Sequence, residues 1–81
     1  MKTSAKTTMA LKIALDREAD GRWIAEIPSL PGVLVYGSSR NEAIRLLRSL
    51  ALRVIADRVE SAKSTPKSLT VTFLGAHSVV A

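Results

Sequence analysis

The stretch IPSLPGVLVYGSSRNEA, residues 27–43, decides the fold of this chain. It crowds turn-forming residues around one short apolar run. Pro28 has no backbone N–H, so it ends or edges the strand that precedes it. Pro31 and Gly32 predict the next tight turn, and VLVYG (residues 33–37) predicts a short strand. We therefore interpret this segment as structural.

A helix begins at the end of this stretch. Ser39 and Glu42 have the spacing of a capping box, in which Ser39 is the N-cap and Glu42 reaches back to the Ser39 amide. The helix is predicted to end near Ser61. A linker broken by Pro66 and a last strand over residues 69–76 follow it. The apolar residues that recur at helical spacing are Ala43, Ile44, Leu47, Leu50, Ala51, Val54 and Ile55.

Two strands precede the opening stretch. Apolar and polar residues alternate over residues 9–16 and again over residues 22–27, which predicts two half-buried strands. Asp20 and Gly21 are a turn pair between them, so the two strands form a hairpin. The sequence thus predicts an α+β fold with the order β-β-β-α-β. We expect a three-stranded antiparallel sheet plus a C-terminal strand packed on one long helix.

Composition limits the possible classes of protein. The 81 residues suit one domain, which we expect over residues 9–76, between a flexible basic tail at 1–8 and a C-terminal tail at 77–81. No apolar run approaches the roughly 20 residues that cross a bilayer. Lys12 and Asp16 interrupt the apolar run that a signal peptide would need. The chain has no cysteine, and we expect a cytoplasmic protein without membrane association.

No set of residues points to catalysis. The single histidine, His77, has no nucleophile or carboxylate partner that the sequence can assign. The segment GSSRNEA lacks the second glycine and the lysine of a phosphate-binding loop. Four carboxylates around the predicted hairpin lack the regular ligand spacing of a metal-binding loop. They are Asp16, Glu18, Asp20 and Glu26. We expect no enzymatic activity, no metal and no cofactor.

The predicted helix has two features that allow more than one interpretation. It carries Arg45, Arg48, Arg53 and Arg58, in a chain with a net charge of +5. These charges permit nucleic-acid binding, but a solvated helix face is more often what such charges mean. Leu46 and Leu52 fall outside the main apolar stripe. They predict an oligomer or partner contact, or they are single exposed leucines that need no explanation.

The order of these pieces resembles the N-terminal domain of the HicB family of antitoxins. The shared pattern is an acidic hairpin with Asp-Gly, an aromatic residue, A-x-x-P-x-L-P-G, a short strand, a glycine, a small polar pair and x-E-A. The resemblance covers about residues 9–60. The matching positions are Asp20, Gly21, Trp23, Ala25, Pro28, Leu30, Pro31, Gly32, Gly37, Ser38, Ser39, Glu42 and Ala43.

The resemblance implies a partial RNase H-like fold with no catalysis of its own. Members of the family bind a small RNA-cleaving toxin of the HicA kind and block it, and they commonly form dimers or tetramers. Many carry an additional C-terminal DNA-binding domain. Few residues follow the last predicted strand here, so we do not expect this chain to repress an operon by itself.

Charge sets this chain apart from many antitoxins of that family. Many are acidic, which suits a basic toxin, whereas this chain is basic. Attraction to a basic toxin would then be local, through the hairpin carboxylates. We expect an antitoxin-like binding protein that covers its toxin sterically. The alternative is a stand-alone basic nucleic-acid-binding domain that uses the helix arginines.

Overall fold

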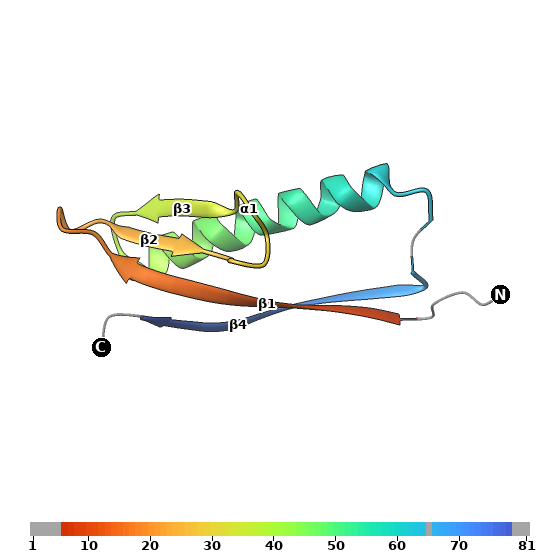
Figure 1. The fold of residues 1–81 in the computed structure, drawn as a ribbon, viewed down its shortest axis with the longest axis horizontal. Coiled ribbons are helices and arrows are strands. Elements are labelled where there is room, and N and C mark those ends of the chain that lie inside the picture. Colours follow the sequence, from red (N-terminus) through yellow and green to blue (C-terminus); the bar gives the residue numbers. More distant parts are fainter. Residues whose placement is uncertain (1–5, 65, 79–81) are drawn as a thin grey trace.

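The computed structural model describes residues 6–64 and 66–78 of the chain. It confirms the α+β class and the order β-β-β-α-β (Figure 1). One long helix lies along one side of a four-stranded sheet. The elements are β1 (Lys6–Arg17), β2 (Trp23–Glu26), β3 (Leu34–Gly37), α1 (Arg40–Ser61) and β4 (Ser68–Ser78).

The four strands form one mixed sheet in the order β3-β2-β1-β4. β1, β2 and β3 pair antiparallel, as the two predicted turns require. β4 pairs with β1 in the parallel direction. The last strand is therefore an edge strand of the sheet, and not a separate strand packed on the helix as we expected.

The length of α1 explains the position of β4. The 22 residues of the helix extend about 33 Å, whereas the 4 residues of β3 extend only about 13 Å. The helix runs back along the sheet and carries the chain well past the start of β3 (Figure 1). β4 then returns beside β1, because a helical crossover is the usual connection between parallel strands.

Both terminal strands are longer than the sequence predicts. β1 includes residues 6–8, which we assigned to a flexible tail, because these residues pair with β4. β4 runs to Ser78, so His77 lies in a strand and not in a C-terminal tail. The remaining parts of the two predicted tails lie outside the described residues. Periodicity missed the start of β1 because its polar residues face solvent on both sides of the strand.

α1 covers one face of the sheet with an apolar core. β1 contributes the alternating residues Leu11, Ile13 and Leu15, and the helix contributes the stripe that its sequence predicts. No polar or charged side chain is buried among the described residues. The buried side chains are Leu11, Ile13, Leu15, Ala25, Ile27, Leu30, Val33, Ala43, Ile44, Leu47, Ala51 and Ile55.

The loop between β2 and β3 belongs to this core. Two consecutive turns bury Ile27, Leu30 and Val33. The Leu30 N–H donates to the Ile27 carbonyl at 2.9 Å, and the Val33 N–H donates to the Leu30 carbonyl at 3.0 Å. Pro31 and Gly32 are central in the second turn, where Gly32 has φ of 86°, as a type II turn requires. The prolines and glycines of the opening stretch thus fold three apolar side chains inward.

The helix cap forms with one difference from the prediction. The Ser39 hydroxyl accepts a hydrogen bond from the Glu42 N–H at 3.1 Å, as expected. Glu42 Oε1 instead accepts from the N–H and the hydroxyl of Ser38, at 2.6 and 2.9 Å. Two donors on one residue bind this oxygen in place of the Ser39 amide. The helix ends at Ser61, and no helix of the described residues is long and apolar enough to cross a membrane.

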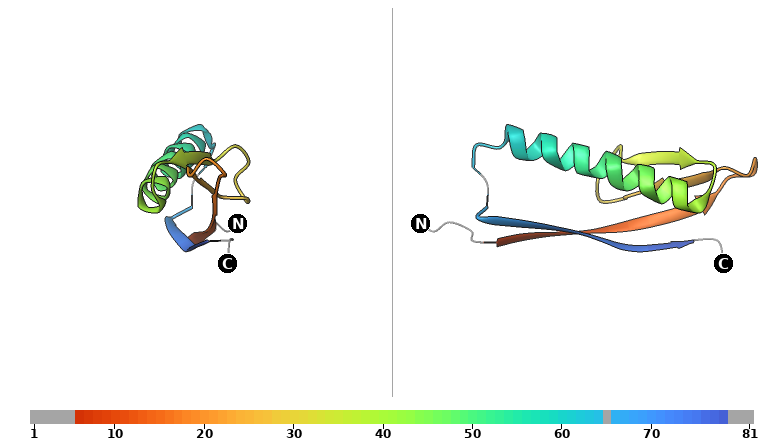
Figure 2. Two further views of the ribbon diagram at one scale, coloured as in Figure 1. Left: turned by 90° about the vertical axis from the view of Figure 1, so that its left-hand side faces the viewer. Right: turned by 180° about the vertical axis from the view of Figure 1, so that it is seen from behind.

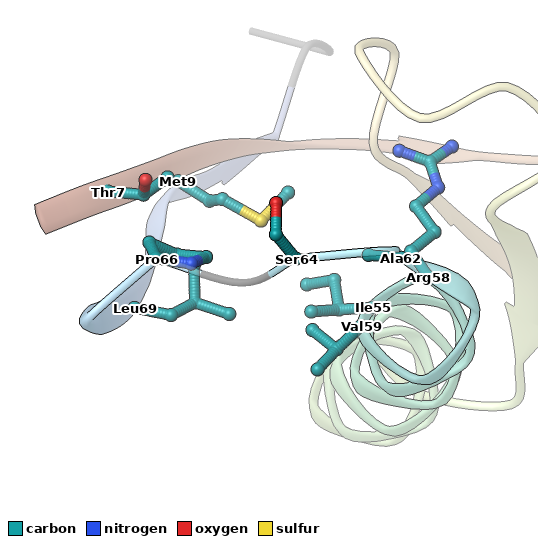
Figure 3. A pocket seen from close by; sticks show the side chains of 9 residues that line it. All are labelled: Thr7, Met9, Ile55, Arg58, Val59, Ala62, Ser64, Pro66 and Leu69. Carbon is teal, nitrogen blue, oxygen red and sulfur yellow. The ribbon is translucent and has the colours of Figure 1, made fainter. Parts of the chain in front are cut away.

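The sheet is much narrower at one end. β2 pairs with β1 only along residues 14–17, so residues 6–13 of β1 pair with β4 alone. We call this two-stranded part, residues 6–13 and 68–75, the ribbon. It runs under the C-terminal half of α1 (Figure 2). An apolar pocket of about 170 Å³ lies between ribbon and helix (Figure 3). Its lining is Thr7, Met9, Ile55, Arg58, Val59, Ala62, Ser64, Pro66 and Leu69.

Candidate protein-binding face

In the described residues, α1 lies on one side of the sheet and no helix covers the other side (Figure 2). Alternation along each strand sends one set of side chains into the core and the other set to this face. We call this second surface the open face. On β1, β2 and β3 its side chains are Lys12, Ala14, Asp16, Ile24, Glu26, Leu34 and Tyr36.

The strand register places acidic and apolar side chains of the open face in adjacent positions. Asp16 is paired with Ile24, which is paired with Tyr36 on the next strand. In the neighbouring row, Glu26 is paired with Leu34. Leu34 and Tyr36 are 40% and 44% exposed. Large apolar side chains that stay exposed beside carboxylates are typical of a surface that a partner protein covers.

The tip of the β1–β2 hairpin carries a compact cluster at one end of the open face. Gly21 has φ of 94°, which confirms the turn predicted at Asp20-Gly21. Asp20 Oδ1 accepts from the Arg22 N–H at 3.0 Å, and Asp20 Oδ2 lies 2.8 Å from Arg22 Nε. The Arg22 guanidinium lies 4.4 Å from the centroid of the Tyr36 ring. Arg22 therefore links a carboxylate to an aromatic ring.

These hydrogen bonds lower the pKa of Asp20. The backbone N–H of Arg22 is the main cause, desolvation opposes it, and the Arg22 side chain adds to it. Asp20 is therefore ionised and already paired within its own turn. It stabilises the hairpin, and its role as a partner contact stays a prediction.

The other three predicted carboxylates have different surroundings. Asp16 lies on the open face, where its Oδ1 accepts from the Arg17 N–H at 2.8 Å. Glu26 is exposed on the same face. Glu18 lies in the hairpin turn, where its N–H donates to the Arg22 carbonyl at 2.7 Å. Asp16 and Glu26 are thus the two that share a strand face. The described part of the chain holds no group of three or more His, Cys, Asp and Glu that could bind a metal ion.

The apolar members of the open face were not predicted as a binding surface. The sequence did contain a signal for these residues. β2 and β3 have apolar residues at successive positions. Because successive side chains of a strand point to opposite faces, some of these residues must lie on the open face. Alternation identifies the strands, but it does not say that the second face stays uncovered. The residues missed are Ile24, Leu34 and Tyr36.

The four helix arginines considered for nucleic-acid binding do not gather into one basic patch. At 3.6 residues per turn, residues 45, 48, 53 and 58 spread over more than half of the helix circumference. The Arg48 guanidinium lies 5.8 Å from the centroid of the Phe73 ring on β4. Arg53 Nη1 donates to a serine hydroxyl one turn earlier, at 2.9 Å. Arg48 and Arg53 therefore make contacts within the chain.

The two leucines predicted to contact an oligomer or a partner lie on different sides of the helix. Leu52 is 49% exposed, whereas Leu46 is half-buried. Their spacing separates them by about 120° around the helix axis. They do not form one contact surface.

No family model matches the chain, and no curated protein and no solved structure matches it. The resemblance to the HicB-type domain therefore depends on the motif residues and on the order of elements. Those motif residues build the two loop turns, the hairpin turn and the helix cap in the structure. They account for the fold, whereas the side chains of the open face lie mostly outside the motif.

Proposed function

We propose that this chain is an antitoxin-like binding protein that neutralises a small, basic, HicA-type RNA-cleaving toxin by steric occlusion. It acts in the cytoplasm, as a homodimer or tetramer, without catalysis and without a cofactor. The open face is the surface that contacts the toxin. The proposal is supported by the sequence resemblance and by the composition of that face.

One observation carries the proposal: an exposed aromatic residue and an exposed leucine lie beside carboxylates on a sheet face that no helix covers. Tyr36 and Leu34 supply apolar area, and tyrosine is among the residues that contribute most of the binding free energy at many interfaces. Asp16 and Glu26 supply negative charge in the adjacent strand positions. Lysines and arginines that bind RNA on a toxin are suitable partners for these carboxylates.

The distribution of charge agrees with this surface even though the chain is basic overall. Four of the seven acidic residues lie within residues 16–26, together with only two of the twelve lysines and arginines. Charges separated by more than about 8–10 Å are largely screened at physiological ionic strength. A basic toxin at the open face therefore interacts mainly with this acidic segment and with Lys12 on the same face, and little with positive charge elsewhere.

Nucleic-acid binding through the helix arginines is the second candidate function. The net charge of +5 favours it. The arrangement of the arginines favours it less, because a strand of phosphates is bound along a continuous basic surface. Tyr36 is the one aromatic residue on the open face among the described residues, whereas stacking surfaces for single strands usually have several.

The experiment that tests the proposal is affinity capture of the tagged chain from its native cell lysate, with and without ribonuclease, followed by mass spectrometry. The expected result is a small basic protein recovered in near-equal amount and retained after ribonuclease treatment. Ribosomal proteins and RNA that disappear after ribonuclease treatment would favour the second candidate. Recovery of no specific protein under either condition would overturn the proposal.

A second assay measures occlusion directly. The captured protein is purified alone and tested for RNA cleavage, then titrated with this chain. The expected result is cleavage that stops at the molar ratio of the complex. A captured protein that cleaves RNA equally well in the complex would contradict steric neutralisation, even if binding is tight.

A further inference from the structure

The outer edge of β4 has no pairing partner in the described structure. β4 runs over 11 residues at the edge of the sheet and pairs only with β1. Proteins usually protect such an edge by making it short, by placing charged residues or proline on it, or by bending it with a bulge. The opposite edge strand, β3, has only 4 residues and is protected by its shortness.

β4 lacks these protections along most of its length. Residues 69–75, LTVTFLG, include no charged residue and no proline. The register shift that marks a bulge comes after Gly75, opposite Ile13 and Ala14 of β1. The side chains of Leu69 and Leu74 are 37% and 41% exposed. This segment is therefore an uncharged and partly apolar template for another strand.

The chain exposes more surface than a compact monomer of its size. A folded monomer of 8.7 kDa exposes about 4,700 Å², whereas this chain exposes 5581 Å². The difference of about 900 Å² is close to the roughly 800 Å² that each partner buries in a stable interface. The molecule is elongated, 52 × 22 × 17 Å, and its two-stranded end extends from the sheet.

We propose that β4 pairs antiparallel with β4 of a second copy of this chain, about a two-fold axis at Thr72. The product is one eight-stranded sheet. Its strand order is β3-β2-β1-β4 in one copy, followed by β4-β1-β2-β3 in the second copy. An antiparallel pair of identical strands is symmetric and closed, so the assembly stops at two copies. The axis is perpendicular to the sheet, so both open faces lie on the same side of the dimer.

The register follows from the side chains of the segment. An axis at Thr72 pairs Val71 of each copy with Phe73 of the other on the helix side of the sheet, and Thr70 with Leu74 on the other side. Aromatic and β-branched residues in directly opposite positions stabilise antiparallel pairs. This register also keeps the pairing between Leu69 and Gly75, before the bulge.

Charge limits which strand edge can pair between two copies of the chain. Two copies with a net charge of +5 repel each other, so self-association requires a segment without charge. β4 supplies such a segment. The free edge of β1 does not, because Lys6 and Lys12 would lie within the paired region. This inference concerns the chain alone and does not depend on the toxin-binding proposal.

Sedimentation equilibrium of the full chain tests the assembly. The expected mass is twice 8.7 kDa. Thr72→Lys and Thr72→Glu each place two like charges in opposite positions at the axis, and each should raise the dimer dissociation constant by about tenfold or more. Mixing the two variants should restore a dimer that contains one of each. Ala10→Lys is the matched control: it lies on the same face, one strand inward, where the two lysines are too far apart to interact strongly.

Cysteine cross-linking gives a second test that does not depend on charge. The chain has no cysteine, so Thr72→Cys introduces a single thiol. Directly opposite residues of an antiparallel pair have Cα atoms about 4.5–5.5 Å apart, which is within the range for a disulfide. Under mild oxidation Thr72→Cys should form a covalent dimer, and Ala10→Cys should not.

These two experiments distinguish the β4 interface from other modes of self-association. If the wild type forms a dimer or a larger assembly, and Thr72→Lys and Thr72→Glu split it into monomers or smaller units, the result supports the interface. A monomeric wild type, an oligomer that both charged variants leave unchanged, or equal cross-linking at residues 10 and 72 would overturn the proposal. Loss of toxin capture with the dimer intact would affect the proposed function alone.

Discussion

Gly37 lies against the first turn of α1 so closely that no side chain fits between them. A Cβ placed on Gly37 would be 2.6 Å from the amide nitrogen of Ala43 and 2.8 Å from its Cα. Both atoms belong to the helix backbone, which cannot move aside as a flexible side chain can. The end of β3 and the start of α1 are therefore joined by a contact that requires glycine.

This contact predicts that Gly37→Ala destabilises the protein by about 3 kcal/mol, the upper part of the range for an overpacked core. Urea denaturation followed by circular dichroism measures the change. Adding Ala43→Gly should not restore stability, because that change removes the Cβ of Ala43 and leaves the two nearer backbone atoms in place. Full rescue by the double substitution would show that the side chain, and not the helix backbone, is the obstacle.

Gly32→Ala is the matched control for this prediction. Gly32 has φ of 86°, and a Cβ there would meet no atom within 4 Å. Its cost is the backbone strain of a positive φ, about 1–2 kcal/mol. Gly32→Asn should cost less than Gly32→Ala, since asparagine tolerates this conformation. The same order of alanine and asparagine at residue 37 would contradict a steric cause there.

The helix cap predicts a dependence of stability on pH. Hydrogen bonds from the Ser38 N–H, and then from the Ser38 hydroxyl, lower the pKa of Glu42 from its ordinary value of 4.5. A lowered pKa in the folded state means that the carboxylate stabilises the fold fully above pH 4.5 and loses this effect as the pH falls through the folded value. Glu42→Gln should therefore be less stable than the wild type at pH 7, and the difference should disappear in acid.

Comparing the stability of the wild type with that of Glu42→Gln isolates the effect of the Glu42 carboxylate. Asp20 also has a lowered pKa, so the pH dependence of the wild type alone would include both groups. Both proteins contain Asp20, so its effect cancels in the difference between them. Ser39→Ala tests the other half of the cap and should cost about 1 kcal/mol at every pH. A pH-independent difference between wild type and Glu42→Gln would mean that the charge of Glu42 does not stabilise the cap.

Local chemistry explains which parts of the fold were predictable. The turn at Asp20-Gly21, the turn at Pro31-Gly32 and the cap at Ser39 each depend on residues within a few positions, and the structure confirms all three. The partner of β4 depends instead on how far α1 carries the chain. That distance follows from helix length, but the choice of β1 as a neighbour requires the whole sheet. The exposure of Tyr36 is likewise a property of the assembled sheet, because its strand alternates in the same way whether or not a second layer covers it.

The loop between β2 and β3 predicts that Leu30 behaves as a core residue although it lies in a loop. Leu30 is 3% exposed and is held by hydrogen bonds on both sides. Leu30→Ala should cost about 2–5 kcal/mol, the range for deletion of a buried leucine side chain. Ser29→Ala, at the exposed neighbouring position, should leave the denaturation midpoint nearly unchanged. Equal effects of the two substitutions would show that the loop is separate from the core.

The open face predicts that Glu26→Lys weakens binding to the captured partner by about tenfold or more, because it places a positive charge opposite a basic surface. Glu60→Lys makes the same change in net charge at an exposed position near the end of α1, so it controls for the overall charge and should leave the dissociation constant unchanged. Tyr36→Ala should weaken binding to a similar degree through lost apolar contact. Calorimetric titration at two salt concentrations separates the two causes, since only the effect of Glu26→Lys should shrink as salt rises. Equal losses for Glu26→Lys and Glu60→Lys would indicate that net charge alone governs the complex and that the open face is not the contact surface.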